Sequence, residues 1–320
     1  MTGLIAASTS AADKRVAFRA GLTSGKIQRL PGAINPLTAK LIQAIGFEGV
    51  YISGGAFSAG LGLPDIGLTT LTEVVAHSRQ IAGVTDLPVL IDADTGFGEP
   101  MSAARTVLAA EDAGIAGLHL EDQVNPKRCG HLDGKAIVPT DEMVRRLRAA
   151  VTARRDPNFV ICARTDAAGI GDMAASGRGD MAASGKVGID AAIERAKAYA
   201  DAGADLIFTE ALHTEADFAK FRAAVDIPLL ANMTEFGKSQ LIPAQTLEDI
   251  GYNAVIYPVT TLRLAMGAIE RGLREIHATG TQEGQLDQMQ TRSRLYELLE
   301  YERYNEFDSG VFNFTLGGNQ

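Results

Sequence analysis

Short runs rich in Val, Ile and Leu recur along the chain, and each is followed by a turn and then by helical periodicity. Runs that are apolar throughout are typical of strands buried on both faces, as in parallel sheets. Strands of this kind that alternate with helices predict a (β/α)₈ barrel. The eight runs lie at 26–33, 49–53, 88–94, 117–122, 159–166, 205–210, 227–232 and 254–258.

Amphipathic helices are expected between the strands, for example at 101–113, 141–154, 189–202 and 214–224. The alternative fold is an open, doubly wound sheet. The nucleotide-binding signal of such sheets, G-x-G-x-x-G after the first strand, is missing here, which favours the barrel. We therefore expect one domain over 1–320, with the barrel at about 26–277.

Two segments depart from this pattern. Residues 284–306 predict a long helix in a C-terminal helical extension (about 281–307), whose apolar stripe we expect to pack on a neighbouring subunit. A tandem duplication, "GDMAASGR" at 171–178 and "GDMAASGK" at 179–186, is small, polar and Gly-rich, which predicts a mobile loop.

Composition narrows the class of protein. The net charge of -9 argues against nucleic acid as a partner, because phosphates require a basic face. Two cysteines in 320 residues do not suggest a disulfide framework and fit a reducing cytosol. Neither a secretory signal nor a membrane-spanning apolar run is recognised, so we expect a cytoplasmic protein without a membrane partner.

Polar residues collect at the carboxyl ends of the predicted strands, where barrel enzymes carry the active site. So many polar strand ends are hard to explain as solvated loop alone. They are Ser53, Asp92, Asp94, Glu121, Asp122, Arg164, Asp166, Glu210, Asn232 and, just beyond the last strand, Arg263.

The stretch "DADTGFG" (92–98) contains two carboxylates with alternate spacing. If both lie on the strand, Asp92 and Asp94 face the same side and suit a hard cation such as Mg²⁺, which takes few protein ligands. Alternatively, Asp94 caps the next helix in a glycine-containing turn. Glu121, at the next strand end, adds to the acidic rim and favours the metal.

The stretch "KRCGH" (127–131) places Cys129 among two cations and a histidine. A zinc site would need more thiol or imidazole ligands at short spacing. The cationic neighbours would lower the thiol pKa, so Cys129 could be a nucleophile, a general acid, or a residue of an ordinary surface loop. Cys162 lies in the middle of a strand and is expected in the core.

Two arginines could bind carboxylates. Arg164 and Arg263 fall at strand ends, where a guanidinium can form paired hydrogen bonds with a carboxylate. Arg292 lies on the extension, and its position alone indicates a solvated helix face.

With these features together, the chain resembles the isocitrate lyase/phosphoenolpyruvate mutase superfamily, and most closely its methylisocitrate lyases. The resemblance runs from about residue 13 to about residue 307. It rests on "YISGG" (51–55), "GLPD" (62–65), "DADTGFG", "HLEDQ" (119–123), "KRCGH", "ARTDA" (163–167), "ANMTEFG" (231–237) and "MQTRSRLYELL" (289–299).

The resemblance implies a barrel with an N-terminal helix, Mg²⁺ as cofactor, and a homotetramer whose C-terminal helices are swapped between subunits. It also implies cleavage of a small tricarboxylate, 2-methylisocitrate, to pyruvate and succinate. The alternatives are a lyase of the same superfamily acting on isocitrate or dimethylmalate, and a non-catalytic binding protein on a barrel scaffold.

Residue roles also follow from the resemblance. Asp92 and Asp94 would form the metal site, with Asp65 and Glu121 reaching it mainly through water. Tyr51 would accept a proton and Cys129 would donate one, with His131 and Glu121 as further catalytic residues. The substrate would be held by Ser53, Gly54, Gly55, Cys129, Gly130, Arg164, Glu210, Asn232, Met233, Thr234, Arg263 and Arg292.

Overall fold

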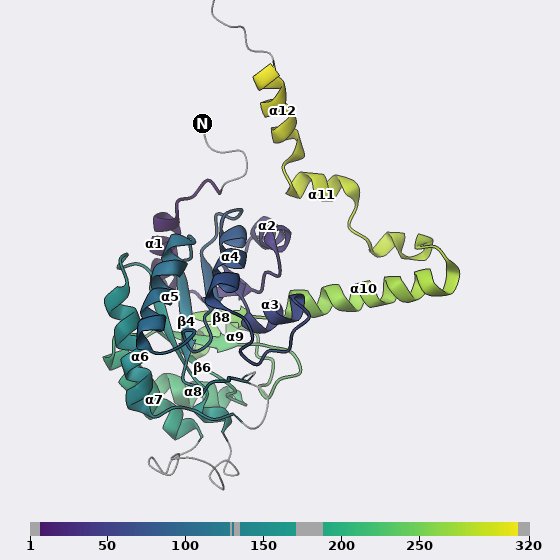
Figure 1. The fold of residues 1–320 in the computed structure, drawn as a ribbon. Coiled ribbons are helices and arrows are strands. Elements are labelled where there is room, and N and C mark those ends of the chain that lie inside the picture. The colour runs from purple at the N-terminus through teal and green to yellow at the C-terminus, as the bar shows by residue number, and fades with distance from the viewer. Residues whose placement is uncertain (1–6, 129, 131–134, 171–187, 313–320) are drawn as a thin grey trace, which may run out of the picture.

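A computed structural model describes residues 7–128, 130, 135–170 and 188–312, and shows a barrel of eight parallel strands (Figure 1). The predictions for Cys129, His131 and the duplicated segment lie outside these residues. All eight predicted strands are confirmed. They are β1 (Gln28–Pro31), β2 (Val50–Ile52), β3 (Val89–Asp92), β4 (Gly117–Glu121), β5 (Val160–Thr165), β6 (Leu206–Thr209), β7 (Leu229–Asn232) and β8 (Ala254–Tyr257).

The strands pair in the order β1-β8-β7-β6-β5-β4-β3-β2, and every pair is parallel. A single parallel bridge between Gly32 and Tyr51 joins the two ends of this sheet. The Ala33 backbone N–H donates to the Tyr51 carbonyl at 2.8 Å across the same seam. The sheet therefore closes on itself, and the predicted barrel is confirmed.

The four predicted barrel helices are found within a residue of their expected bounds. These four are α5 (Pro100–Asp112), α6 (Thr140–Ala153), α7 (Ile189–Asp201) and α8 (Glu215–Ala224). The other described helices are α1 (Ala11–Leu22), α2 (Pro36–Ile45), α3 (Gly54–Gly60), α4 (Leu71–Ala82), α9 (Ala244–Ile250), α10 (Thr260–Thr279), α11 (Arg292–Leu298) and α12 (Tyr301–Phe312), with short 3₁₀ turns η1 (Ala167–Gly169) and η4 (Glu283–Gln288).

Alternation along each strand separates two apolar layers. Ile91 and Leu118 belong to the larger cluster, between the strands and the outer helices. Leu90 and Cys162 belong to a smaller cluster in the barrel interior, so the core position predicted for Cys162 is confirmed. Side chains two positions apart on a strand face the same side. The last interior-facing position of a strand therefore brings its polar group to the carboxyl-end mouth, as Asp92 does two residues after Leu90.

The expected N-terminal helix is α1. Ser10 caps it, because its hydroxyl accepts a hydrogen bond from the Asp13 backbone N–H. Phe18 and Leu22 belong to the interior cluster. Lys14 is buried and donates hydrogen bonds to the carbonyls of Ala82 and Thr85, which precede β3. These contacts fix α1 near the amino ends of the strands, away from the polar mouth.

The C-terminal extension differs from the prediction in detail. The single helix expected over 284–306 is wrong, because the segment is divided into η4, α11 and the start of α12. Thr291 caps α11 by accepting from the Arg294 N–H, and Glu300 takes a left-handed conformation (φ 56°) between α11 and α12. Local capping and this left-handed residue break the helical path.

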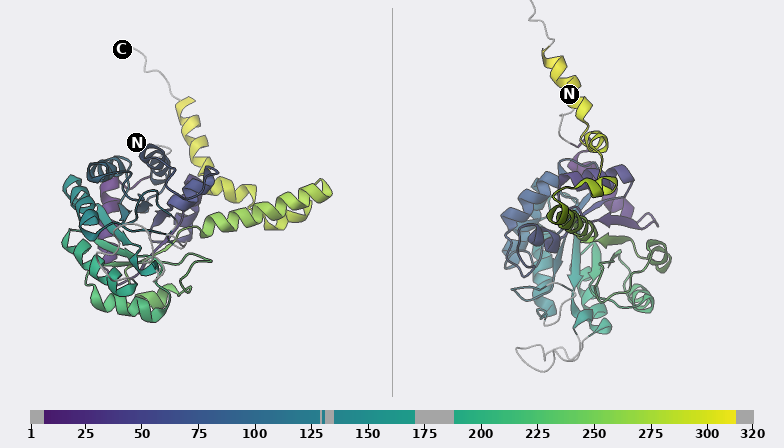
Figure 2. Two further views of the ribbon diagram at one scale, coloured as in Figure 1. Left: turned by 60° about the horizontal axis from the view of Figure 1, so that its bottom comes forward. Right: turned by 90° about the vertical axis from the view of Figure 1, so that its right-hand side faces the viewer.

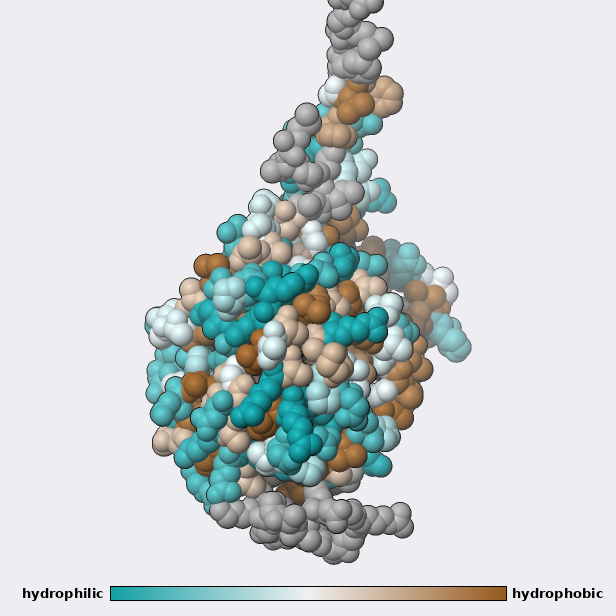
Figure 3. All heavy atoms as spheres, turned by 60° about the vertical axis from the view of Figure 1, so that its left-hand side comes forward, coloured by the Kyte–Doolittle hydropathy of each residue, from teal (hydrophilic) through white to brown (hydrophobic). Residues whose placement is uncertain are grey.

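Figure 2 shows α10 projecting away from the barrel. It has no buried residue, and several large apolar side chains on it are exposed: Leu264, Met266, Ile269, Leu273 and Ile276. Figure 3 shows a mainly polar barrel face with hydrophobic residues on the extension behind and above it. Within the described ranges, every helix is too short or too polar to cross a bilayer.

Candidate active site

A small cavity opens at the carboxyl end of the barrel and collects most of the residues expected there. Its walls combine an acidic side, an arginine-centred side and an apolar floor. It is lined by Tyr51, Ser53, Gly55, Asp65, Asp92, Lys127, Arg128, Gly130, Arg164, Phe208, Glu210, Asn232, Thr234, Ile256, Pro258, Val259 and Arg263.

The acidic side is built at the end of β3. The strand stops at Asp92, and Asp94 lies beyond it with a left-handed backbone (φ 47°). The expectation that both acids share a strand is therefore wrong, because a tight turn replaces the last strand residues. Asp92 accepts hydrogen bonds from the N–H groups of Asp94 (3.0 Å) and Gly54 (3.3 Å). A Cβ on Gly54 would lie 2.9 Å from Asp92 Oδ2 and 3.5 Å from Asp94 Oδ1, so the turn still brings the carboxylates together.

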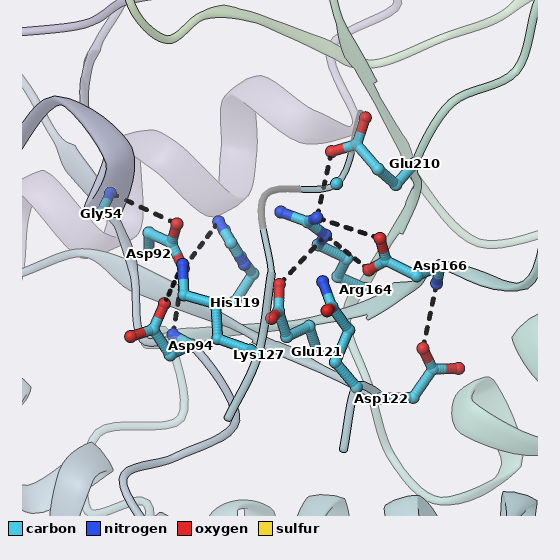
Figure 4. Close-up of polar contacts among 12 residues, drawn as sticks. Gly54, Asp92, Asp94, His119, Glu121, Asp122, Lys127, Arg164, Asp166 and Glu210 are labelled. Atoms are coloured by element: carbon cyan, nitrogen blue, oxygen red, sulfur yellow. Dashed lines mark hydrogen bonds and ion pairs between the residues drawn. The ribbon is translucent and has the colours of Figure 1, made fainter. Parts of the chain in front are cut away.

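Lys127 joins this acidic group from the "KRCGH" segment (Figure 4). Its Nζ lies 2.8 Å from Asp94 Oδ1 and also forms a close ion pair with Asp65. Burial by itself lowers the pKa of Lys127, but the carboxylates around it, Asp92 and Asp94 first, raise that pKa overall. Lys127 is therefore a permanent positive charge among the acids.

The two aspartates differ in their acidity. Burial raises the pKa of Asp92, but His119 when protonated, Lys127 and Arg164 outweigh burial and bring it to about 2. Burial and the neighbouring Asp92 carboxylate raise the pKa of Asp94 to about 6. Such crowding of negative charge favours a cation. Oxygen donors of this type suit Mg²⁺, which binds one or two carboxylates and keeps several waters. Among the described residues, no three acidic, histidine or cysteine side chains already surround one ion-sized position.

Tyr51 and His119 form a buried pair beside the acids. The Tyr51 hydroxyl lies 2.8 Å from His119 Nε2, which is 3.7 Å from Asp92 Oδ1. Burial raises the pKa of Tyr51 well above its ordinary value, and burial also lowers the pKa of His119 to about 4. Both groups are therefore neutral near pH 7, and they share one hydrogen bond.

Arg164 is the centre of the opposite side. Its guanidinium contacts three carboxylates: Asp166 at 2.9 Å, Glu121 at 3.3 Å and Glu210 at 3.4 Å. It also lies over the Phe208 ring, 5.1 Å from the centroid. Burial lowers the pKa of Arg164, but these carboxylates raise it well above its ordinary value. Burial, together with Asp166 and Asp92, raises the pKa of Glu121 well above the ordinary value.

The remaining predicted residues differ in whether their side chains reach the cavity. Ser53 caps α3, accepting from the Ala56 N–H at 3.3 Å, and lines the cavity with Gly55, Asn232 and Thr234. Met233 is different, because its side chain packs in the outer core. Its backbone N–H donates to the Ile256 carbonyl at 3.0 Å, so its predicted contact with the substrate stays a prediction.

The two distal arginines do not occupy equivalent places. Arg263 lines the cavity and pairs with Glu235 at 2.9 Å while stacking on Phe236. Arg292 begins α11 and does not line the cavity of a single chain. Its role in substrate binding stays a prediction, and in the predicted swapped tetramer a partner subunit's extension could supply it.

Sequence reasoning missed two residues that the structure places in the site. Lys127 was considered only as a neighbour of the thiol, whereas it bridges two acids. His119 was not singled out at all. A signal for it existed, because it lies two residues before Glu121 on the same strand and therefore faces the same side.

A strongly polar mouth on a closed (β/α)₈ barrel defines an enzyme class whose chemistry lies at the strand ends. The sequence profile described as phosphoenolpyruvate phosphomutase matches residues 18–277. A crystal structure of phosphonopyruvate hydrolase in complex with oxalate and Mg²⁺ is similar to the chain, with a TM-score of 0.78 and 28% identity, covering 92% of this chain and 98% of that one.

Curated relatives narrow the class further. A protein from Corynebacterium glutamicum named probable 2-methylisocitrate lyase 2 is 66% identical over 98% of this chain and 97% of its own length. The 2-methylisocitrate lyase of Escherichia coli is 45% identical over 92% of this chain and 95% of its own length. The chain therefore belongs to the 2-methylisocitrate lyases of the phosphoenolpyruvate mutase/isocitrate lyase superfamily. The expected family and the expected class, a carbon–carbon lyase, are confirmed.

Proposed function

We propose that this chain cleaves 2-methylisocitrate to pyruvate and succinate with Mg²⁺ as cofactor, as a step of propionate use through the methylcitrate cycle. The observation that carries the proposal is the juxtaposition, in one cavity, of an acidic cluster and a buried arginine. A tricarboxylate that binds a divalent cation needs both, and the family relationship supplies the particular substrate.

The acidic side is the proposed metal site. Asp92 and Asp94 would hold Mg²⁺, with Asp65 and Glu121 acting mainly through water. When bound, Mg²⁺ supplies Lewis-acid stabilisation of negative charge on substrate oxygens. Lys127 partly neutralises two of these carboxylates, Asp94 and Asp65. It therefore holds them in place and limits how much negative charge the substrate meets.

The arginine side and the backbone donors would bind the carboxylates of the substrate. Arg164 is already charged and held by three acids, so little reorganisation is needed when a carboxylate arrives. Ser53, at the amino end of α3, offers its hydroxyl, and Gly55 offers its backbone N–H. The Gly54 N–H is also proposed to bind the substrate, and to do so it would exchange its present acceptor, Asp92, for a substrate oxygen. Asn232, Thr234 and Arg263 complete the walls of the proposed substrate site.

Cleavage of the carbon–carbon bond requires one proton to leave the substrate hydroxyl and another to reach the carbon that becomes succinate. Tyr51 is the proposed acceptor, and its own phenolic proton can pass to His119 Nε2, 2.8 Å away. Cys129 is the proposed donor, because a thiol flanked by Lys127 and Arg128 is a suitable acid for a carbanion. His131 and Glu121 are proposed to assist these transfers.

Three further statements belong to this proposal. A homotetramer with swapped C-terminal helices would cover the exposed apolar face of α10 and bring Arg292 toward a site. A cytoplasmic location would suit the two cysteines. Some activity on isocitrate is also expected, because one methyl group discriminates by only about 1–3 kcal/mol in an apolar pocket.

The test is a Mg²⁺-dependent assay of product release from purified 2-methylisocitrate, isocitrate and 2,3-dimethylmalate, each supplied separately. We expect pyruvate from 2-methylisocitrate with the highest kcat/KM. Higher kcat/KM with isocitrate or 2,3-dimethylmalate would assign the chain to the alternative lyases. Failure to cleave any of the three with Mg²⁺ present would favour a binding protein.

A further inference from the structure

We propose that Lys135 is a positioning residue for the lyase reaction: it ties the backbone of Gly130, the residue bonded to Cys129, to the Arg164–Asp166 ion pair. This inference rests on the proposed function, because it gives Lys135 a part in the same reaction. Neither the sequence pattern nor the family resemblance singles out Lys135.

The geometry of the ammonium group carries the inference. Lys135 Nζ donates hydrogen bonds to the Gly130 carbonyl and to Asp166 Oδ1, the latter at 2.8 Å. The side chains of Lys135 and Asp166 are 1% and 0% exposed. Because water is excluded, the ammonium charge depends on Asp166 for compensation, and its protons are directed at these two acceptors.

Asp166 connects this lysine to the substrate arginine. Its carboxylate accepts from Arg164 Nε at 2.9 Å and from Arg164 Nη2 at 3.2 Å. Asp166 thus lies between two buried cations, Arg164 at the end of β5 and Lys135 beyond the "KRCGH" segment. Gly130 also packs directly against Arg164, because a Cβ at position 130 would overlap the guanidinium. The same peptide segment is therefore held from two directions.

Asp166 is itself fixed from behind, as Figure 4 shows in part. Its backbone N–H donates to Asp122 Oδ1 at 2.9 Å. Asp122 in turn accepts from the Thr165 hydroxyl (2.8 Å) and the Tyr199 hydroxyl (2.8 Å), the latter from α7. Lys135 therefore attaches Gly130 to a rigid part of the barrel.

Loss of the ammonium group would leave Gly130 without this anchor and Asp166 with one cation fewer. A reacting group displaced by about 1 Å can cost on the order of 10²-fold in rate. We therefore expect kcat of Lys135→Met to fall by about 10- to 100-fold. A role confined to folding would lower thermal stability without this effect on kcat.

The experiment compares wild type with Lys135→Met and with the matched control Lys14→Met. Lys14 is also buried and donates to two backbone carbonyls, but it lies near the amino ends of the strands. For each protein, kcat for 2-methylisocitrate, the melting temperature and the rate of thiol alkylation by iodoacetamide are measured. Cys162 is fully buried, so alkylation of folded protein reports on Cys129, which the unreactive Cys129→Ser variant verifies.

We expect Lys135→Met to lose kcat and to change the alkylation rate, whereas Lys14→Met keeps both and loses only stability. Wild-type kcat and alkylation in Lys135→Met would overturn the inference. If Lys135→Met does not fold, Lys135→Gln, which keeps a donor for the Gly130 carbonyl without the charge, is measured in the same way. A wild-type enzyme that does not cleave 2-methylisocitrate would instead contradict the proposed function, while the alkylation comparison still tests the anchor.

Discussion

A methyl group at position 130 has no room between Arg164 and Glu210. A Cβ on Gly130 would lie 2.6 Å from Glu210 Cγ and 2.8 Å from Glu210 Cδ, and closer still to Arg164 Nη2. Carbon atoms in contact are normally about 3.5–4.0 Å apart, so Gly130→Ala must displace one of these groups by about 1 Å. Both groups are in the proposed substrate site.

Displacement of that size predicts a loss of about 10²-fold in kcat/KM. Overpacking typically costs about 1–3 kcal/mol, so the melting temperature should fall by only a few degrees and the fold should persist. Steady-state release of pyruvate from 2-methylisocitrate, with melting followed by circular dichroism, measures both quantities.

Gly60→Ala is the matched control, because a Cβ on this last residue of α3 meets no atom within 4 Å. It should keep wild-type kcat/KM. A displacement of about 1 Å should cost far more than threefold in kcat/KM. If the kcat/KM of Gly130→Ala also stays within about threefold of wild type, the close packing of Gly130 on Arg164 is not required for activity.

The other predictions concern the metal and the duplicated segment. Asp92→Ala should abolish activity at ordinary Mg²⁺ with little change in melting temperature, because strand-end acids contribute little to the core; full activity with undiminished Mg²⁺ affinity would remove the metal assignment. Mg²⁺ binding should weaken as the pH falls, because burial and Asp92 raise the pKa of Asp94 to about 6 and the metal must displace that proton. Calorimetry should show the apparent Kd rising about tenfold per pH unit below that value and constant above it, and a flat profile from pH 7 to 5 would contradict this. Deleting 171–178 should change thermal stability little, since small polar loops bury little apolar surface, and loss of the assembled oligomer on deletion would show the segment to be structural.

The barrel could be predicted because its information is local. Each strand is a short apolar run, and alternation along it decides which side chains face the interior. Asp92, Glu121 and Arg164 therefore reach the mouth as expected from their positions at strand ends. The same rule would have identified His119, two residues before Glu121.

Details that depend on backbone turns and on charge pairing could not be predicted. Asp94 leaves the strand through a left-handed residue, so its place in the acidic cluster follows from the turn and not from alternation. Lys127 bridges Asp65 and Asp94 across long sequence separations, and only the folded chain brings these groups together. The extension is divided by the Thr291 cap and by Glu300, whose conformation no apolar stripe reveals.

The central claim is that the site cleaves its substrate with Cys129 as proton donor. The most direct test is the kcat of Cys129→Ser relative to wild type with saturating 2-methylisocitrate and Mg²⁺. Serine is nearly the same size as cysteine but a much weaker acid, and general acid catalysis contributes about 10²–10⁴-fold. We predict a fall in kcat of at least that order, with substrate affinity within about tenfold of wild type. Near-normal turnover by the serine variant would contradict the account.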